Sequence, residues 1–234
     1  MFRLISIIAF LCTVIGLGLY HVILRSRHIS HEKEPLDVPR FSLLERCVHA
    51  VAILSLITLG FTGFVSVVVF GSPLRGWLWL AHFMAAPLFA IALAIIALIW
   101  EEDGRFEDHD WKWARHLGGY LWKRHDLPAA RFNAGQKAYF WFVGLCSILV
   151  ILSGVERLYP IFGSAGQAVV FDIHRYSALV LVLAVITHFY LGTLANPGTL
   201  WAMISGDVGS NWAKRHHPIW WERMTKGGKE NHDA

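Results

Sequence analysis

Charged side chains are scarce in this 234-residue sequence. Asp, Glu, Lys and Arg together make up 16% of it, against about 25% in an ordinary soluble domain. Hydrophobic residues make up 55%, and the mean hydropathy is +0.46. This composition excludes an ordinary soluble domain and is typical of a membrane protein.

Cysteine is also scarce, and its pattern excludes two kinds of redox centre. Cys12, Cys47 and Cys146 lie in or beside apolar runs and form no CxxC or CxxCH motif. CxxCH attaches c-type haem covalently, and iron–sulfur clusters take sets of cysteine ligands. Any haem in this chain would be held by ligation alone, and the thiols are expected to be buried.

Long apolar runs are what the sequence has instead. A helix needs about 20 apolar residues to cross a hydrocarbon core roughly 30 Å thick. In lipid the backbone N–H and C=O groups of a segment must form hydrogen bonds within the protein, which only helices and closed barrels allow. The sequence lacks the alternating strands of a barrel, so helices are predicted. The predicted transmembrane helices are Leu4–Leu24, Ala50–Phe70, Gly76–Trp100, Ala138–Val155 and Ala168–Leu194.

The predicted fold is all-α, a transmembrane four-helix bundle with one additional N-terminal transmembrane helix. Residues 1–28 would form the extra helix and residues 40–200 the four-helix domain, with a loop at 101–137. Residues 201–234 would form a C-terminal tail. A secretory signal is the alternative for the first run, but that run is longer than the about 7 to 15 residues of a signal core and no A-x-A cleavage site follows it.

The distribution of Lys and Arg predicts how the helices cross the membrane. Two connections carry only Arg75 and Arg157, whereas basic residues cluster in the other loops and the tail. By the positive-inside rule the basic loops face the cytoplasm. We predict a multi-pass protein of a bacterial inner membrane, with a periplasmic N-terminus, a cytoplasmic C-terminus and no nucleic-acid partner. The clustered residues are Arg25, Arg27, Lys33, Arg40, Arg105, Lys112, Arg115, Lys123, Arg124, Arg131, Lys137, Lys214, Arg215, Arg223, Lys226 and Lys229.

Four of the 13 histidines lie within the last four apolar runs or at their thresholds: His49, His82, His174 and His188. An ionisable side chain inside a membrane is costly and is by default a candidate for function. The alternative for any one of them is a histidine hydrogen-bonded to another helix. The others are assigned to an interface, charged loops and the tail: His21, His28, His31, His109, His116, His125, His216, His217 and His232.

Depth in the membrane sorts these four histidines into two pairs. In the predicted orientation His49 and His188 lie near the cytoplasmic face, and His82 and His174 near the outer face. On the last helix the two histidines are 14 residues apart, about 21 Å of rise and four turns less roughly 40°. They therefore project from nearly one face, each with a depth-matched partner on another helix.

This arrangement favours haem over other metals. Zinc or copper would want three or four ligands at one depth. Two imidazoles fill both axial positions of a haem iron, leave no site for oxygen chemistry and suit electron transfer. We predict two haems b in the bundle core, with His82 and His174 as axial iron ligands of an outer haem and His49 and His188 as those of an inner haem.

At this point the sequence resembles the cytochrome b (gamma) subunits of membrane-bound respiratory formate dehydrogenases over roughly residues 40–222. In that family the matching histidines ligate two haems b in the same pairs. Similarly spaced histidines occur in cytochromes b of hydrogenases and thiosulfate reductases, but RFNAGQK and AKRHHP point to the formate dehydrogenase branch. The motifs that carry the resemblance are ERCVH, LAHF, RFNAGQK, the IH…TH pair and WAMISGDVGSNWAKRHHPIWW.

The resemblance also implies a menaquinone or ubiquinone site at Asn133, Gly135 and Gln136, with His188 close by. Amide groups can donate to a quinone carbonyl, and glycine lets a ring approach the backbone. The same residues would equally suit a helix start, with Asn133 as N-cap.

As the resemblance implies, this chain would be the quinone-reducing, electron-transfer subunit of an oxidoreductase of anaerobic respiration. Electrons from formate would leave a molybdenum or tungsten catalytic (alpha) subunit, pass an iron–sulfur (beta) subunit, cross the outer and inner haems, and reduce quinone near the cytoplasmic face. The alternatives are the cytochrome b subunit of a hydrogenase or thiosulfate reductase, and a membrane anchor that only docks a partner. The chain departs from the family by its extra N-terminal helix and by Ala50 where better-known members have Trp, which bears on partner contacts and not on the haem ligands.

Overall fold

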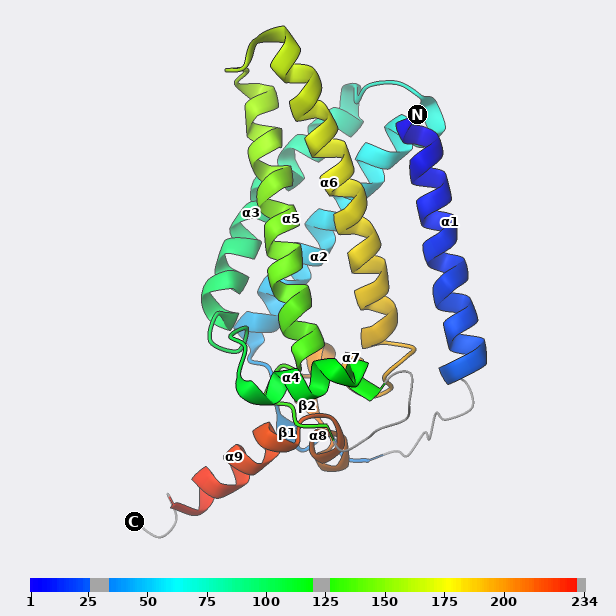
Figure 1. The fold of residues 1–234 in the computed structure, drawn as a ribbon. Helices are drawn as coiled ribbons and strands as arrows, with labels where there is room; N and C mark the ends of the chain where they lie inside the picture. Colours follow the sequence, from blue (N-terminus) through cyan, green and yellow to red (C-terminus); the bar gives the residue numbers. More distant parts are fainter. Residues whose placement is uncertain (26–33, 120–126, 231–234) are drawn as a thin grey trace.

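Long helices dominate the computed structural model, which describes residues 1–25, 34–119 and 127–230 (Figure 1). Two of them continue into a π-helical segment. The long helices are α1 (Phe2–Tyr20) with η1 (His21–Arg25), α2 (Leu43–Phe64) with η3 (Val65–Phe70), α3 (Gly76–Trp100), α5 (Ala134–Leu158) and α6 (Gly163–Gly192).

Each of these five helices is long and apolar enough to cross a membrane. The predicted all-α transmembrane bundle with an additional N-terminal helix is confirmed. Four of the helices begin earlier than the predicted apolar runs, and two of these, α2 and α5, are started by polar capping residues. Ser42 caps α2 in a capping box with Glu45, so that the polar first turn is helical although it is not hydrophobic.

The helices alternate in direction along the bundle (Figure 1). α2 packs along α3, and α5 packs along α6. The N-terminus lies at the same end as the α2–α3 and α5–α6 connections, whereas the C-terminal elements lie at the opposite end. We call the first the His82 end and the second the His49 end, after the histidine that each contains.

Helix α1 lies beside α6 and is tied to it and to α2 by aromatic rings. The Phe2 ring meets the Tyr176 ring edge-on with centroids 5.1 Å apart, and Phe10 meets Phe64 in the same way at 5.2 Å. At the other end of α1, His21 Nδ1 lies 3.2 Å from the Tyr190 hydroxyl. His21 therefore contacts a neighbouring helix, and the extra helix is attached to the outside of the bundle.

Two of the three cysteines are not buried as expected. Cys146 lies in the bundle core with Phe89 and Leu181, but Cys12 and Cys47 are exposed on the surface of the protein. Their helices turn these positions outward, and in a membrane span such a surface faces lipid.

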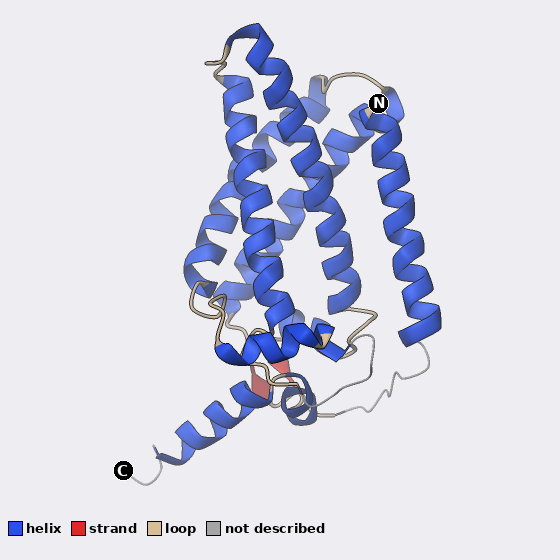
Figure 2. Cartoon of the chain, in the orientation of Figure 1, coloured by secondary structure: helices blue, strands red, loops and turns tan. Residues whose placement is uncertain are grey.

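The His49 end carries short elements that the apolar pattern did not predict (Figure 2). One is a two-stranded antiparallel sheet in which Val38 pairs with Val208. The backbone carbonyl of Gly206 accepts hydrogen bonds from the N–H groups of Arg40 and Phe41 and supports this pairing. The elements are β1 (Val38–Pro39), α4 (Asp108–Arg115), η4 (Leu117–Gly119), α7 (Thr199–Ile204), β2 (Asp207–Val208), α8 (Ser210–His216) and α9 (Pro218–Glu230).

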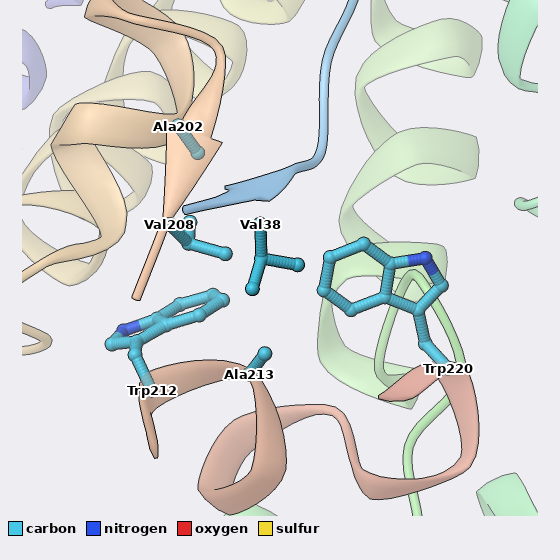
Figure 3. Close-up of a cluster of buried hydrophobic side chains, with 6 residues drawn as sticks. All are labelled: Val38, Ala202, Val208, Trp212, Ala213 and Trp220. Atoms are coloured by element: carbon cyan, nitrogen blue, oxygen red, sulfur yellow. The ribbon is translucent and has the colours of Figure 1, made fainter. Parts of the chain in front are cut away.

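A small hydrophobic core holds these elements together (Figure 3). The side chains of Trp212 and Trp220 enclose Val38 and Val208 from the two strands. Burial of these large rings stabilises the end of the bundle outside the membrane span. The complete cluster is Val38, Ala202, Val208, Trp212, Ala213 and Trp220.

Some predicted loop and tail positions lie outside the described residues. They are His28, His31, His125, His232, Arg27, Lys33, Lys123 and Arg124.

Candidate haem-ligand pairs and the quinone-site residues

The four histidines singled out in the sequence form two pairs in the structure. The rings of His82 on α3 and His174 on α6 have centroids 6.4 Å apart. Those of His49 on α2 and His188 on α6 have centroids 6.5 Å apart. The structure thus brings together the residues that depth matching had paired, and α6 contributes one member to each pair.

The spacing within each pair suits one metal ion between two imidazoles. An imidazole nitrogen binds a transition metal at about 2.0–2.1 Å and lies roughly 1.1 Å from its ring centre, so two rings on opposite sides of one ion have centroids about 6.3 Å apart. Both observed spacings agree with this value. The residues present therefore fit an iron with two axial histidines.

At the His82 end, a threonine hydroxyl fixes which ring nitrogen of His82 carries the proton. Thr62 Oγ1 donates its proton to the carbonyl of Thr58 at 2.7 Å and lies 2.8 Å from His82 Nδ1. Because the hydroxyl proton is already used, Oγ1 accepts from an Nδ1–H group. His82 Nε2 is then the unprotonated nitrogen that a metal requires.

His174 is oriented in the same way by α5. Its Nδ1 lies 3.0 Å from the carbonyl oxygen of Val150 and 3.1 Å from Ser153 Oγ. A carbonyl can only accept, so Nδ1 carries the proton and Nε2 is free for metal. Next in sequence, Gly154 leaves room beside the ring, since a Cβ there would lie 3.4 Å from His174 Cε1.

The pair at the His49 end is surrounded by aromatic rings. The ring of Tyr139 stacks on that of His188, with centroids 4.3 Å apart and planes 8° from parallel. The indole of Trp100 lies 6.0 Å from the His49 ring and donates from Nε1 to Glu45 Oε1 at 2.7 Å. Aromatic packing therefore orients these imidazoles.

Thr62, Ser153 and Tyr139 were not identified in the sequence. Each stands in an apolar run, where a lone polar residue is noticeable but does not reveal its partner. Their signal was a hydroxyl group inside a membrane span, which must find an acceptor there.

The predicted quinone-site residues form the start of α5. Asn133 Oδ1 accepts from the Gln136 N–H at 2.9 Å, and Gln136 Oε1 accepts from the Asn133 N–H at 3.0 Å. Asn133 is therefore an N-cap in a complete capping box. The amide NH₂ groups of both side chains, which are the donors that a quinone carbonyl needs, take no part in this box.

Gly135 lies under another side chain. A Cβ at this position would come within 2.7 Å of Trp113 Cη2 on α4, so only glycine fits beneath the indole. Tyr139 stands one turn after Gln136 and stacks on His188. The first two turns of α5 thus connect the capping residues with the His49–His188 pair.

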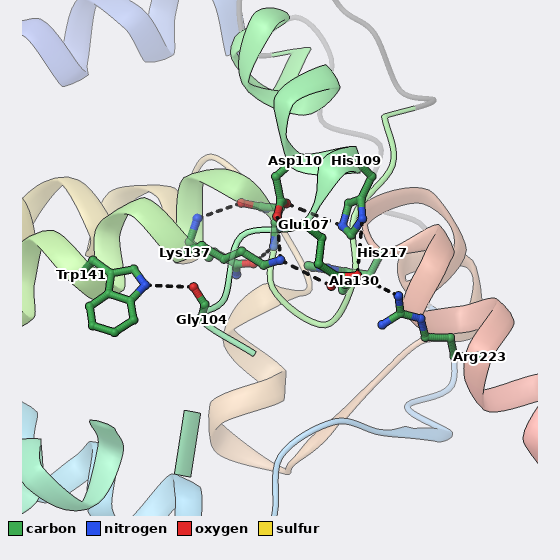
Figure 4. A network of polar contacts seen from close by, with 11 residues as sticks. Gly104, Glu107, His109, Asp110, Ala130, Lys137, Trp141, His217 and Arg223 are labelled. Atoms are coloured by element: carbon green, nitrogen blue, oxygen red, sulfur yellow. Dashed lines mark hydrogen bonds and ion pairs between the residues drawn. The ribbon is translucent and has the colours of Figure 1, made fainter. Parts of the chain in front are cut away.

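A layer of charged and polar side chains covers this start of α5 (Figure 4). Lys137 Nζ lies 2.7 Å from Asp110 Oδ2, and both side chains are almost completely buried. Glu107 bridges Lys137 and Arg223, at 3.7 and 3.0 Å. Partial burial alone would raise the pKa of Glu107, but the hydrogen bond and charge of Arg223, with smaller contributions from His109 and Lys137, lower it below its usual value.

A second set of polar side chains connects helix ends at the His49 end of the bundle. Arg131 donates to Glu45 Oε1 at 2.7 Å and also contacts Asp103. Arg40 is buried against the rings of Phe41, Trp212 and Trp220, at 4.8 to 5.5 Å. These contacts join α2, the α3–α5 connection and the C-terminal elements.

His217 is buried in the same region. It lies 2.7 Å through Nδ1 from the Ala130 carbonyl, which only accepts, so Nδ1 is protonated. Burial, together with the nearby charge of Arg40, lowers the pKa of His217 well below its usual value. His217 is therefore a neutral structural donor.

Within residues 1–25, 34–119 and 127–230, no three His, Cys, Asp or Glu side chains converge as a metal ion without haem would require. The pairwise arrangement does not match the three or four convergent ligands of zinc.

Residues 40–206 match the profile of a family described as prokaryotic cytochrome b561. The formate dehydrogenase cytochrome b556(fdo) subunit of Escherichia coli K12 is 30% identical over 148 residues, covering 62% of this chain and 69% of that protein. The nitrate-inducible cytochrome b556(Fdn) subunit of the same strain is 28% identical over 163 residues, covering 67% and 74%. The formate dehydrogenase cytochrome b556 subunit of Haemophilus influenzae is 26% identical over 146 residues, covering 60% and 61%. The matched family segment contains both histidine pairs.

Proposed function

The chain belongs to the prokaryotic cytochrome b561 family, and from this premise we propose that it is the two-haem cytochrome b subunit of a membrane-bound formate dehydrogenase that reduces quinone. The observation that carries the proposal is the pair of histidine pairs, with centroid spacings of 6.4 and 6.5 Å at opposite ends of α6. Haem b, when bound by two imidazoles, takes up and releases single electrons without an open iron position.

The residues at each end have different tasks. His82 and His174 would hold a haem that accepts electrons from an iron–sulfur partner subunit, itself supplied by a molybdenum or tungsten catalytic subunit. His49 and His188 would hold a haem on the side of the quinone. Formate oxidation itself belongs to the catalytic subunit.

The NH₂ groups of Asn133 and Gln136 bind the quinone carbonyl, and Tyr139 orients the His188 ring beside them. The capping box supports this role because only the side-chain oxygens of Asn133 and Gln136 take part in it. The NH₂ groups of both side chains therefore stay available to donate to a ligand. The two donors are thus already positioned when quinone binds.

The His49 end faces the cytoplasm of a bacterial inner membrane, and the N-terminus lies on the periplasmic side. Support comes from the basic residues of this end, among them Arg40, Arg131, Lys137 and Arg215. Inward electron transfer with proton uptake at the inner face contributes to a proton-motive force.

Substitutions that keep the helix cap but remove the donor test the quinone site. Asn133→Asp and Gln136→Glu retain the capping oxygens, and a negative charge is tolerated at a helix start. We expect both variants to retain the haem spectrum and to lose quinone-dependent reoxidation of the reduced haems. Normal reoxidation in both would place quinone elsewhere, and loss of haem would point to a structural role.

Purification of the complex from its native membrane tests the electron donor. A formate dehydrogenase catalytic subunit is the expected companion, whereas a hydrogenase or thiosulfate reductase subunit would overturn this part of the proposal. A purified chain without a reduced b-type α-band would leave only the membrane-anchor alternative.

A further inference from the structure

Helix α4 places a buried ion pair directly against the start of α5. Lys137 Nζ lies 2.7 Å from Asp110 Oδ2, and the two side chains are 1% and 2% exposed. Removing both charges from water is expensive, and an apolar pair of the same size would often be at least as stable. A buried pair beside a candidate redox site is therefore a candidate for function as well as for anchoring.

Two buried atoms at this ion pair, one on Asp110 and one on the neighbouring His109, have no hydrogen-bond partner in the described part of the chain. Asp110 Oδ1 and His109 Nε2 are buried, and neither makes a hydrogen bond to any described residue. They lie 3.6 Å apart, just beyond hydrogen-bonding distance. A small movement would bring the imidazole within hydrogen-bonding distance of the carboxylate.

Exposure increases from this pair towards the solvent. His109 is 16% exposed, and Glu107, which lies 3.8 Å from His109 Nδ1 and 3.7 Å from Lys137 Nζ, is 42% exposed. Arg223 of α9 contacts Glu107 from the solvent side. The charged groups of α4, α5 and α9 thus form a continuous series from the surface to Lys137 (Figure 4).

The same face of α4 covers the quinone-site residues. Asp110 and Trp113 are three positions apart and project from one side of the helix. Asp110 contacts Lys137, and Trp113 covers Gly135. Lys137 and Gln136 both stand in the first turn of α5, so the series ends at the helix turn that carries the predicted quinone amides.

We propose that Glu107, His109, Asp110 and Lys137 form the path by which protons reach the quinone from the aqueous phase at the His49 end. The inference rests on the function proposed above. Reduction of each quinone to quinol takes up two electrons and two protons, and this path supplies the two protons. Lys137 donates a proton to the reduced quinone oxygen and regains one from Asp110, which is supplied in turn by His109 and solvent.

The competing role for these residues is structural. Asp110 Oδ2 also accepts from the backbone N–H of Glu107 and so caps α4. Asp110→Asn preserves an acceptor for this cap but cannot carry a proton. Lys137→Arg preserves the positive charge and the ion pair, but a guanidinium does not release its proton in this pH range. Asp108→Asn removes the same charge from an exposed position of the same helix and is the matched control.

The experiment measures reoxidation of the haems in membranes that contain the whole complex. The haems are reduced with dithionite, which bypasses the catalytic subunit, and a soluble naphthoquinone is added in a stopped-flow spectrometer at pH 6 to 9. We expect Asp110→Asn and Lys137→Arg to slow reoxidation roughly 100-fold, the lower range of what positioned proton transfer contributes. Their rates should fall as pH rises and recover on addition of imidazole as a diffusible proton donor, with unchanged haem content.

Each outcome decides one question. If wild-type haem is not reoxidised by quinone, the proposed function fails. If the wild type and Asp108→Asn react normally and Lys137→Arg does so with the same pH profile, the proton path is wrong while quinone reduction stands. A slow variant that imidazole does not rescue, or one that loses haem, would assign the ion pair to anchoring α4 and overturn the path.

Discussion

The two histidine pairs share helix α6, yet their rings are held by different forces. At the His82 end, hydroxyl and carbonyl oxygens from neighbouring helices accept the Nδ1 protons of the two rings. At the His49 end, the rings of Tyr139 and Trp100 pack against the imidazoles, and a charged layer outside the membrane span covers the start of α5, the helix that carries Tyr139.

The two pairs consist of the same residue type, and the groups around the rings make them different. A hydrogen bond at Nδ1 raises the basicity of a ligand imidazole and fixes its tautomer. Stacking fixes the plane of a ring through packing alone. The rings at the His82 end are therefore oriented by hydrogen bonds inside the membrane span, whereas those at the His49 end are oriented by aromatic packing.

Substitution of one histidine of a pair is expected to have the largest effect, the loss of one haem. His174→Ala and His188→Ala should each lose one haem and leave about half of the b-type absorbance, because one axial imidazole no longer holds that iron. Redox titration of the purified complex should then show the remaining component alone. His21→Ala, which removes a histidine outside the two pairs, is the control. Loss of both haems from either His174→Ala or His188→Ala would contradict two independent sites.

Acid should damage the His49 end before the His82 end. The pKa of buried His217 lies well below the usual value of about 6.5. As pH falls below 6.5, the unfolded chain binds a proton that the folded chain does not, so stability falls by up to about 1.4 kcal/mol per pH unit. Glu107, whose pKa is also lowered, loses its stabilising charge at still lower pH.

Spectral titration from pH 8 to pH 4 checks this expectation. The inner-haem component should decline at a higher pH than the outer one. His217→Asn keeps a donor for the Ala130 carbonyl without titrating and should move the decline to lower pH. A simultaneous loss of both components would show that the charged layer does not set the difference.

Hydroxyl removal at the His82 end should shift one haem potential. Thr62→Val removes the acceptor of the His82 Nδ1 proton and should raise the potential of the outer haem by about 20–60 mV, equivalent to a hydrogen bond of about 0.5–1.5 kcal/mol. Ser153→Ala should shift it less, since His174 retains the Val150 carbonyl. Thr58→Val is the control, because the Thr58 hydroxyl donates to the Leu54 carbonyl of the same helix.

Loss of stacking should produce the smallest change, confined to the inner haem. Tyr139→Leu removes the ring parallel to His188, and Tyr139→Phe retains it. We expect Leu to shift the low-spin electron paramagnetic resonance signal of the inner haem because the imidazole plane is freed, with Phe close to wild type. An unchanged spectrum in Tyr139→Leu would show that other contacts orient the ring.

Much of the fold follows from local pattern. Apolar length predicted the transmembrane helices, and the 14-residue spacing of His174 and His188 predicted that both face one side of α6. The start of α2 was missed because Ser42 and Glu45 are polar, and hydrophobicity alone does not detect a capping box. The strand pair Val38–Val208 was missed because it joins segments far apart in the chain and lies outside any periodic pattern.

The sequence by itself determined the number of membrane-spanning helices and the pairing of the four histidines, because both depend on regular helical geometry and on the cost of polar groups in lipid. Only the tertiary structure decided which groups accept the Nδ1 protons of His82 and His174, that Tyr139 lies on His188, and that Asp110 meets Lys137. These features depend on side chains from different helices meeting at particular distances, and no one-dimensional pattern encodes such distances.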